Sequence, residues 1–420
     1  MEQLSTKKED DIMRYIIIGN SAAGIGAVEG IRKLDKLGEI IVITDESYHT
    51  YSRPMISYLL CGKTTEEKMK YRNNQFYTEN NCTLLLNTRV EKINIDEKTL
   101  TLDDGSNLAY DKLLVAAGSS AFIPNFEGLD IVDNKYTFIT LDDAHKLNSA
   151  LDESKRVLIV GAGLIGLKCA EGIFKKVSKI TILERSSKIL SSILLDDGAN
   201  FVQNHLESKG IEVRLSENIK RFEKNNALLE SGDCIPFDIL ILAVGVRPNT
   251  ALLNGIAEID KGIIINKKSE TSVSDIYSAG DCTQTLDISD GQSKIMALLP
   301  NAYMQGECAG INMAGGEKTF DKAIPMNAIG FLGLHIITAG NYTGDMYSEN
   351  SDKNYKRLFY NKNKLNGYTL IGNVKKAGIY TNLIREQTSL DTLDFDLICK
   401  EPGLMAFTKE DRTAKLGGMM

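Results

Sequence analysis

The 420-residue sequence has little of what metal and thiol sites require. Its seven cysteines, at positions 61, 82, 169, 234, 282, 308 and 399, form no Cys-x-x-Cys or Cys-x4-Cys pair. This spacing argues against a structural zinc site, a chain-borne iron–sulfur cluster and a redox dithiol. The four histidines, at positions 49, 145, 205 and 335, also lack metal-like spacing. We therefore expect no metal site.

Long apolar runs and clustered positive charge are missing as well. The chain has no run of about 18 apolar residues, so we expect no membrane span. Residues 1–11 are polar and mixed in charge, unlike a signal peptide. We therefore expect a cytoplasmic protein in which residues 1–12 are a dispensable extension. The net charge is −7 and the basic residues form no stripe, which argues against nucleic-acid binding.

The clearest feature that is present is an approximate internal repeat. Residues 14–24 read RYIIIGNSAAG, and residues 156–166 read RVLIVGAGLIG. Each is a short apolar run followed by a glycine turn and a helical pattern. Each is also followed by a second apolar strand that ends in an acid, Asp45 or Glu184. The repeat therefore predicts two β-α-β units, each of a size that binds one dinucleotide.

A second pair of similar segments predicts where the chain crosses between domains. Residues 111–118 (DKLLVAAG) and 238–245 (DILILAVG) are apolar strands that end at a glycine, with a proline a few residues on. Such points suit crossover loops. We predict an α/β protein with two Rossmann-like domains, in which residues 125–244 are inserted into a domain formed by residues 12–124 and 245–322.

The remainder of the chain, residues 323–420, predicts a small α+β domain. Residues 355–359 and 368–371 flank a polar turn and indicate a hairpin. Residues 377–386 have a helical pattern. The last dozen residues, which end in GGMM, are expected to be a loose tail.

The first glycine turn has the parts of a dinucleotide site. Gly19 permits a tight turn, the small Ser21 lets the backbone approach a pyrophosphate, and Gly24 lets the helix pack closely on the strand. The N-terminus of the helix then faces the phosphates with free N–H groups. Asp45, at the end of the next strand, is placed to accept hydrogen bonds from a ribose.

The second glycine turn is a complete G-x-G-x-x-G over residues 161–166. Glu184 ends the following strand. A carboxylate there favours a free ribose 2′-hydroxyl and repels a 2′-phosphate, so NADH is favoured over NADPH. The adjacent Arg185 has two alternative roles, a contact with a 2′-phosphate or a solvated surface charge.

Six segments in order carry a family resemblance: residues 19–24, 51–57 (YSRPMIS), 116–119 (AAGS), 161–166, 245–249 (GVRPN) and 279–281 (AGD). With these segments the chain resembles the FAD-dependent pyridine nucleotide–disulfide oxidoreductases, most of all the branch of NADH:rubredoxin reductases and nitrite reductase flavin domains. The resemblance implies FAD in the outer domain, NAD(H) in the insert and a C-terminal interface domain. It also implies that Asp281 binds the ribityl chain of FAD; the alternative is a helix-capping role.

The motifs and the resemblance together predict a set of cofactor-binding residues. Arg53 is expected to contact the cofactor phosphates or to shape the flavin pocket, unless it is an ordinary surface residue. The full set is Gly19, Ser21, Ala22, Ala23, Gly24, Asp45, Arg53, Pro54, Val90, Ala117, Gly118, Asp281, Gly161, Gly163, Leu164, Ile165, Gly166, Glu184 and Gly245.

Three departures from the family pattern narrow the expected function. Residues 50–55 (TYSRPM) lack the redox cysteine of the disulfide reductases, and Cys61 comes too late to replace it. Without that thiolate, disulfide exchange has no nucleophile and peroxide has no site for sulfenate chemistry. Lys168 stands where many relatives have glutamate, and Tyr58 stands where carrier reductases often have lysine. We hypothesise that Lys168, the candidate catalytic residue, lies near flavin N5 and favours the reduced flavin; the alternative is that it points into solvent.

The expected reaction is hydride transfer between NADH and FAD. We expect the electrons to pass to or from a small electron carrier, which is a rubredoxin, a ferredoxin or an iron–sulfur partner subunit. Two alternatives stay open: an NADH oxidase that reduces oxygen at the flavin, and an FAD-binding assembly subunit of a larger complex. Both a monomer and a homodimer fit the resemblance. A basic hairpin is a candidate docking site for an acidic carrier; its charged residues are Lys353, Lys356, Arg357, Lys362 and Lys364.

Overall fold

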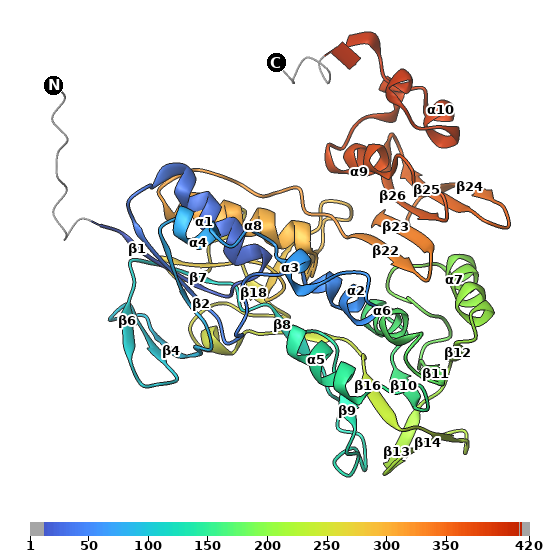
Figure 1. Cartoon of the computed structure of the whole chain (residues 1–420). Coiled ribbons are helices and arrows are strands. Elements are labelled where there is room, and N and C mark those ends of the chain that lie inside the picture. Colours follow the sequence, from blue (N-terminus) through green and yellow to red (C-terminus); the bar gives the residue numbers. More distant parts are fainter. Residues whose placement is uncertain (1–11, 411, 414–420) are drawn as a thin grey trace.

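The structure is a computed structural model that describes residues 12–410 and 412–413. Figure 1 shows three parts: a first dinucleotide domain (blue with yellow and orange), a second one (green) and a C-terminal domain (red) that lies against the second. The predicted N-terminal extension lies outside the described residues except for Ile12, as does most of the predicted tail.

The first domain is built on a five-stranded parallel sheet in the order β19-β7-β1-β2-β3. Its strands are β1 (Arg14–Ile18), β2 (Glu39–Ile43), β3 (Cys82–Leu85), β7 (Lys112–Val115) and β19 (Ile276–Ser278). The central strands are almost wholly apolar because both faces of a parallel sheet are covered. Helices α1 (Ala22–Leu34) and α8 (Leu299–Met313) pack together so closely that a Cβ on Gly306 would lie 1.9 Å from Ala23 O.

Smaller elements complete this domain. They are α2 (Ile56–Leu60), α3 (Glu66–Met69), α4 (Phe76–Glu79), the antiparallel sheet β4 (Val90–Asn94), β5 (Thr99–Leu102) and β6 (Asn107–Ala109), and the strands β18 (Ile263–Ile264), β20 (Thr283–Leu286) and β21 (Ser293–Lys294). A single 3₁₀ turn, η2 (Arg53–Met55), leads directly into α2.

The second domain repeats the plan of the first. Its parallel sheet has the order β12-β11-β10-β16-β9. The strands are β9 (Lys135–Tyr136), β10 (Arg156–Val160), β11 (Lys179–Leu183), β12 (Glu212–Arg214) and β16 (Ile239–Leu242); the helices are α5 (Leu141–Ala150), α6 (Leu164–Ile173) and α7 (Asp196–Ser208). A small antiparallel sheet adds β13 (Ile219–Glu223), β14 (Asn226–Leu229) and β15 (Cys234–Pro236).

The two crossovers between these domains lie side by side. The strands β8 (Ser119–Ala121) and β17 (Val246–Pro248) form an antiparallel pair in which Ala121 faces Val246. The predicted fold class, with one dinucleotide domain inserted in another, is confirmed. The precise boundaries at residues 124, 244 and 322 stay a prediction.

The C-terminal domain is an antiparallel sheet with helices beyond it. The strand order is β22-β23-β26-β25-β24. The elements are β22 (Met326–Phe331), β23 (Leu334–Gly340), β24 (Asp345–Asn350), β25 (Tyr355–Asn361), β26 (Lys364–Ile371), α9 (Ala377–Arg385) and α10 (Phe395–Lys400). The predicted hairpin is β25–β26, and the predicted helix is α9.

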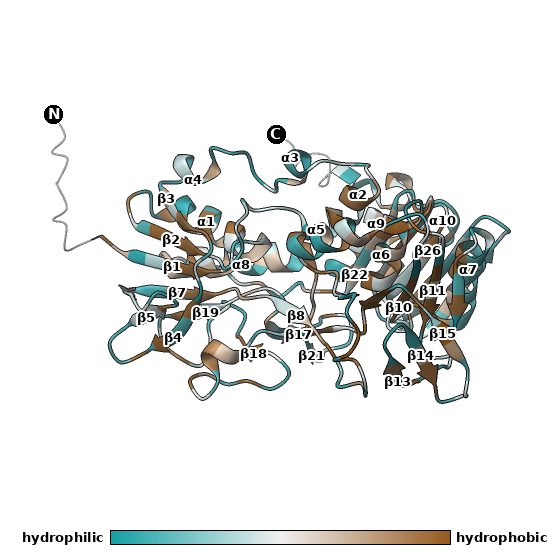
Figure 2. Ribbon diagram, turned by 60° about the horizontal axis from the view of Figure 1, so that its bottom comes forward, coloured by the Kyte–Doolittle hydropathy of each residue, from teal (hydrophilic) through white to brown (hydrophobic). Residues whose placement is uncertain are grey.

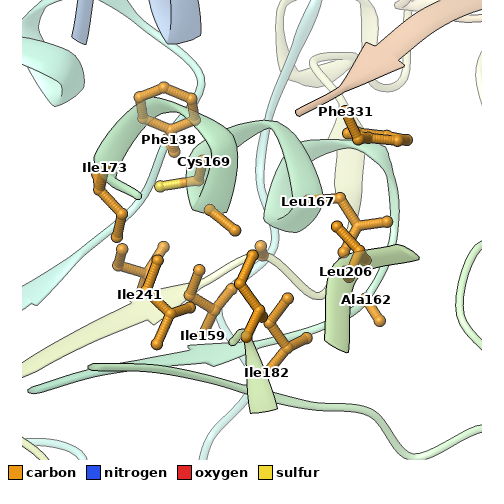
Figure 3. Packing of buried hydrophobic residues seen from close by; sticks show 14 of the residues in the cluster. Phe138, Ile159, Ala162, Leu167, Cys169, Ile173, Ile182, Leu206, Ile241 and Phe331 are labelled. Carbon is orange, nitrogen blue, oxygen red and sulfur yellow. The ribbon is translucent and has the colours of Figure 1, made fainter. Parts of the chain in front are cut away.

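One hydrophobic cluster joins all three parts of the molecule. It contains Leu60 of α2, Leu167 of α6 and Phe331 of β22, all at most 2% exposed. Figure 3 shows Phe331 beside Leu167, above the apolar residues of the second sheet. Figure 2 shows the apolar strands between more hydrophilic outer segments. Among the helices of residues 12–410, none is long and apolar enough to cross a bilayer.

Candidate active site

A cavity of about 990 Å³ opens at the carboxyl ends of β1, β2 and β7. Parallel α/β sheets bind ligands at this edge. The cavity brings together segments that are far apart in the sequence. The predicted residues that line it are Gly19, Ser21, Ala22, Ala23, Asp45, Arg53, Pro54, Val90, Ala117, Gly118 and Asp281.

The first glycine turn forms the floor of this cavity. Gly19 has φ +114°, and a Cβ there would lie 2.1 Å from Ala116 O, so the turn requires glycine. Ser21 is the N-cap of α1, and its side chain does not bond the helix amides. The first N–H groups of α1 are therefore available to an anion in the cavity.

Gly24 has a packing role and is not among the cavity-lining residues. A Cβ on Gly24 would lie 2.0 Å from Gly19 O. This glycine therefore lets α1 start directly against the turn, as its place in the motif predicts.

Arg53 and Asp281 place opposite charges on the cavity wall. Burial raises the pKa of the Asp281 carboxyl, although the Arg53 charge and a hydrogen bond from Ser119 act in the other direction. The Arg53 guanidinium donates to a carboxylate oxygen of Glu46, which also lines the cavity. Arg53 is therefore held at the cavity by Glu46, with its side chain 36% exposed, and its contact with a cofactor stays a prediction.

Glu46 is a cavity residue that the sequence analysis missed. Its Oε2 accepts the Tyr51 hydroxyl at 2.7 Å, and the Tyr51 oxygen accepts the Leu141 N–H at 3.0 Å. Leu141 begins α5 of the second domain, so these bonds connect the cavity with the inserted domain. The available signal was a second acid directly after Asp45.

The cavity passes a simple test of fit for FAD. Its volume suits a large cofactor, the α1 N-terminus offers unpaired amides for a pyrophosphate, and Asp45 and Asp281 offer carboxylates for ribose and ribityl hydroxyls. Gly280 has φ +85°, and a Cβ on it would lie 3.3 Å from Ala23 Cβ, so this part of the wall is closely packed.

The second glycine turn has nearly the same geometry as the first. Gly161 has φ +109°, and a Cβ there would lie 2.3 Å from Ala243 O; a Cβ on Gly166 would lie 2.0 Å from Gly161 O. Gly163 is the N-cap of α6, and a Cβ on it would meet no heavy atom of the described chain within 4 Å. Leu164 and Ile165, in the first turn of α6, are half-buried.

Glu184 lies beside the second glycine turn. Its carboxylate oxygens accept the N–H groups of Ala162 and Ser186, each at 2.8 Å, which fixes the carboxylate beside the glycine turn. Arg185 is exposed. Gly245 has φ +118° and open space around its Cβ position. The structure thus brings residues 161–166 and Glu184 together at the start of α6.

Lys168 is neither in the cavity wall nor in solvent. Its side chain is 15% exposed, and its ammonium donates to Glu171 and to Gly330 O at 3.2 Å. The same ammonium lies 4.1 Å from the centroid of the Tyr58 ring. The solvent-facing alternative is therefore wrong, while the proximity of Lys168 to flavin N5 stays a prediction.

The described cavity wall contains no thiol, and the described residues form no metal-binding cluster. Of the described residues that line the cavity, none is a cysteine. Cys61 is half-buried at the end of α2. Cys169 and Cys282 are buried, and burial raises the pKa of both thiols. Over residues 12–410, no cluster of three or more histidines, cysteines and acids could hold a metal ion.

The basic hairpin is less available than the sequence suggested. Arg357 is 5% exposed and pairs with Asp197 of α7. Lys356 donates to Glu349 and to the carbonyl of Cys399. Arg357 thus pairs with the second domain, whereas Lys356 is bonded within the C-terminal domain, and neither offers unpaired charge. Docking of a carrier at this hairpin stays a prediction. Lys353 and Lys362 are exposed.

Comparison with known proteins decides the family. A model of the pyridine nucleotide-disulphide oxidoreductases matches residues 13–306. The chain belongs to this family. The predicted family branch and the predicted enzyme class, an FAD-dependent NAD(P)H oxidoreductase, are confirmed.

Two curated relatives illustrate the range of this family. The epsilon subunit of NADH-dependent phenylglyoxylate dehydrogenase from Aromatoleum evansii is 31% identical over 394 residues, which cover 90% of this chain and 93% of the relative. An NADH oxidase from Methanocaldococcus jannaschii is 35% identical over 323 residues, which cover 73% of this chain and 71% of the relative.

Solved structures show the same fold over nearly the whole chain. Putidaredoxin reductase in its covalent complex with putidaredoxin has a TM-score of 0.86 at 23% identity, covering 96% of this chain and 98% of that one. NADH:rubredoxin oxidoreductase from Clostridium acetobutylicum has a TM-score of 0.75 at 25% identity, covering 91% and 98%.

Proposed function

We propose that this family member uses FAD to pass electrons between NADH and a one-electron protein carrier or partner subunit. The observation that carries the proposal is the pairing of two glycine-turn sites with a large cavity whose described wall contains no thiol. FAD supplies the chemistry, because a flavin accepts a hydride and releases electrons singly. Without a thiol in the wall, a dithiol intermediate has no place in the route.

The residues of the chain contribute binding and orientation. The N-terminus of α1 binds the FAD pyrophosphate, while Asp45 and Asp281 accept hydrogen bonds from its hydroxyl groups. Glu46 holds the Arg53 guanidinium at the cavity. In the second site the α6 N-terminus binds the NADH pyrophosphate, and the fixed Glu184 carboxylate selects a free 2′-hydroxyl.

Relatives support a protein acceptor. The Aromatoleum relative is a subunit of an NADH-dependent dehydrogenase, the Clostridium acetobutylicum relative is an NADH-rubredoxin oxidoreductase, and the Bacillus subtilis relative is an electron transfer subunit of nitrate reductase. The acceptor class proposed for this chain is therefore a small electron carrier or an iron–sulfur partner subunit. Direct reduction of oxygen is the second candidate, because the NADH oxidase relative is 35% identical.

Anaerobic stopped-flow spectroscopy tests the proposal. NADH is expected to bleach the flavin absorbance of the holoprotein quickly, and added rubredoxin or ferredoxin is expected to restore it. Rapid NADH-driven oxygen uptake without a carrier would favour the oxidase instead. Slow bleaching with a stable partner complex would favour an assembly subunit. A protein that cannot be loaded with FAD would refute all three.

A further inference from the structure

Glu171 lies where the three parts of the molecule meet, at a site that we call the junction. The junction consists of Lys63, Lys168, Glu171 and residues 330–333, which are the end of β22 and the turn to β23. The Glu171 side chain is 5% exposed. One of its oxygens accepts the Lys168 ammonium, and the other accepts Lys63 Nζ at 3.2 Å and the Leu332 N–H at 3.3 Å.

The β22–β23 turn in the junction is strained and is held from outside. Leu332 has φ +48° and Gly333 has φ +92°, a left-handed pair that leucine rarely adopts. Glu171 of α6 accepts the Leu332 N–H, and His205 Nε2 of α7 lies 3.3 Å from the Leu332 carbonyl oxygen. Strained residues of this kind persist where their surroundings fix them, often at functional sites.

The segments that meet at Lys168 lead away from both candidate cofactor sites. Pro54 lines the FAD cavity, and Tyr58, which contacts the ammonium, follows four residues later along a continuous helical segment. Lys168 itself follows Leu164 by four residues on α6. Residues four apart share a helix face, so Lys168 is on the same face of α6 as Leu164 at the second glycine turn.

The charge of this ammonium is compensated at the junction. Burial alone would raise the pKa of the Glu171 carboxyl, but hydrogen bonds and charge from Lys168 and Lys63 hold it below its ordinary value. Glu171 is therefore ionised at neutral pH. Two ammonium groups share one carboxylate, and only Lys63 is largely exposed.

We propose that Glu171 is a positioning residue that fixes the β22–β23 turn and compensates the Lys168 charge, and thereby sets the redox potential of the bound flavin. The inference rests on the proposed function. A bare cation near the flavin would stabilise its reduced, anionic form, and the ion pair weakens that effect. Glu171 thus couples the C-terminal domain to the electron-accepting strength of the site.

Charge-changing variants of the FAD-loaded protein test the electrostatic part. Anaerobic redox titration measures the midpoint potential. Glu171→Gln is expected to shift it upward, because the compensation is lost. Lys168→Met is expected to shift it downward, and the double variant is expected to return towards the wild-type value. Lys175→Met, at an exposed lysine just beyond α6, is the matched control and is expected to shift nothing.

Hydrogen exchange at the turn tests the positional part. In Glu171→Gln an amide oxygen still accepts the Leu332 N–H, so exchange at residues 330–333 is expected to stay slow. In Glu171→Ala the acceptor is gone, and exchange there is expected to speed up. A purely structural role would change exchange and leave the potential unmoved.

The outcomes separate this inference from the function on which it rests. Wild-type potentials in both single variants, or shifts of the same sign, would overturn the inference while leaving a working flavoenzyme. If Glu171→Gln does not fold, the midpoint potential of Lys168→Met is the deciding measurement. A wild-type potential in that variant overturns the inference. A wild-type protein that binds no FAD, or whose flavin NADH does not reduce, overturns the proposed function.

Discussion

Two glycines of the second turn should respond to alanine in opposite ways. Gly161 has φ +109°, and an added Cβ would lie 2.3 Å from Ala243 O. Gly163, two residues on, has φ −80°, and an added Cβ would meet no described heavy atom within 4 Å. One substitution therefore strains the folded chain, whereas the other only fills space that the dinucleotide needs.

The magnitudes follow from these geometries. Gly161→Ala is expected to lower the free energy of unfolding by about 1–3 kcal/mol from backbone strain alone, and by more if the sheet must shift. Gly163→Ala is expected to change it by less than about 1 kcal/mol. Its methyl group would instead hold the pyrophosphate off the helix N-terminus and raise the KM for NADH about tenfold, which is about 1.4 kcal/mol of binding.

Thermal melts of the FAD-loaded proteins and steady-state kinetics with NADH separate these effects. The expected pattern is a lower Tm for Gly161→Ala, and a wild-type Tm with a raised KM for Gly163→Ala. A Gly163→Ala protein that is folded and binds NADH as tightly as wild type would refute the placement of the nicotinamide site.

Three further predictions concern charge. Glu184→Gln keeps an acceptor for the Ala162 N–H but loses repulsion of a 2′-phosphate, so the kcat/KM ratio of NADH to NADPH should fall about tenfold; an unchanged ratio would contradict this role. Arg357→Ala should lower stability to urea by about 1–2 kcal/mol, because the arginine is buried while its partner Asp197 is half exposed; a wild-type midpoint would contradict the domain contact. Hydrogen bonds from Arg156 lower the pKa of Asp238 to about 2, so this carboxylate stabilises the fold above about pH 4 and loses its effect as the pH falls towards 2. Asp238→Asn should therefore cost about 1 kcal/mol at pH 7, after allowance for solvent screening, and flatten the acid limb of the denaturation curve.

The repeated pattern made the two dinucleotide domains predictable. Short apolar runs before residues 19 and 161 became β1 and β10, and the acids that close the next strands came to the glycine turns because parallel strands end at one edge of a sheet. The order of strand, glycine turn, helix and acid is visible in the sequence, and the β-α-β topology then determines which of these parts come together.

Contacts within irregular loops and between distant segments were not predictable in the same way. Glu46 meets Arg53 inside a loop whose path no periodicity reveals, and Glu171 meets a turn more than 150 residues later. Arg357 was expected to be exposed because it is charged, yet it is buried on β25 and pairs with Asp197 of α7. Whether a charged side chain is buried depends on which residue pairs with it in the folded protein. The sequence alone does not show which residue that is.

The pairing of β8 with β17 has a practical consequence for engineering. The chain enters and leaves the inserted domain through neighbouring strands, with Ala121 opposite Val246. A segment cut between those two points can be exchanged for its counterpart from a relative without altering the spacing of the ends. We expect nicotinamide preference to move with this segment when its contacts with α2 and β22 are kept.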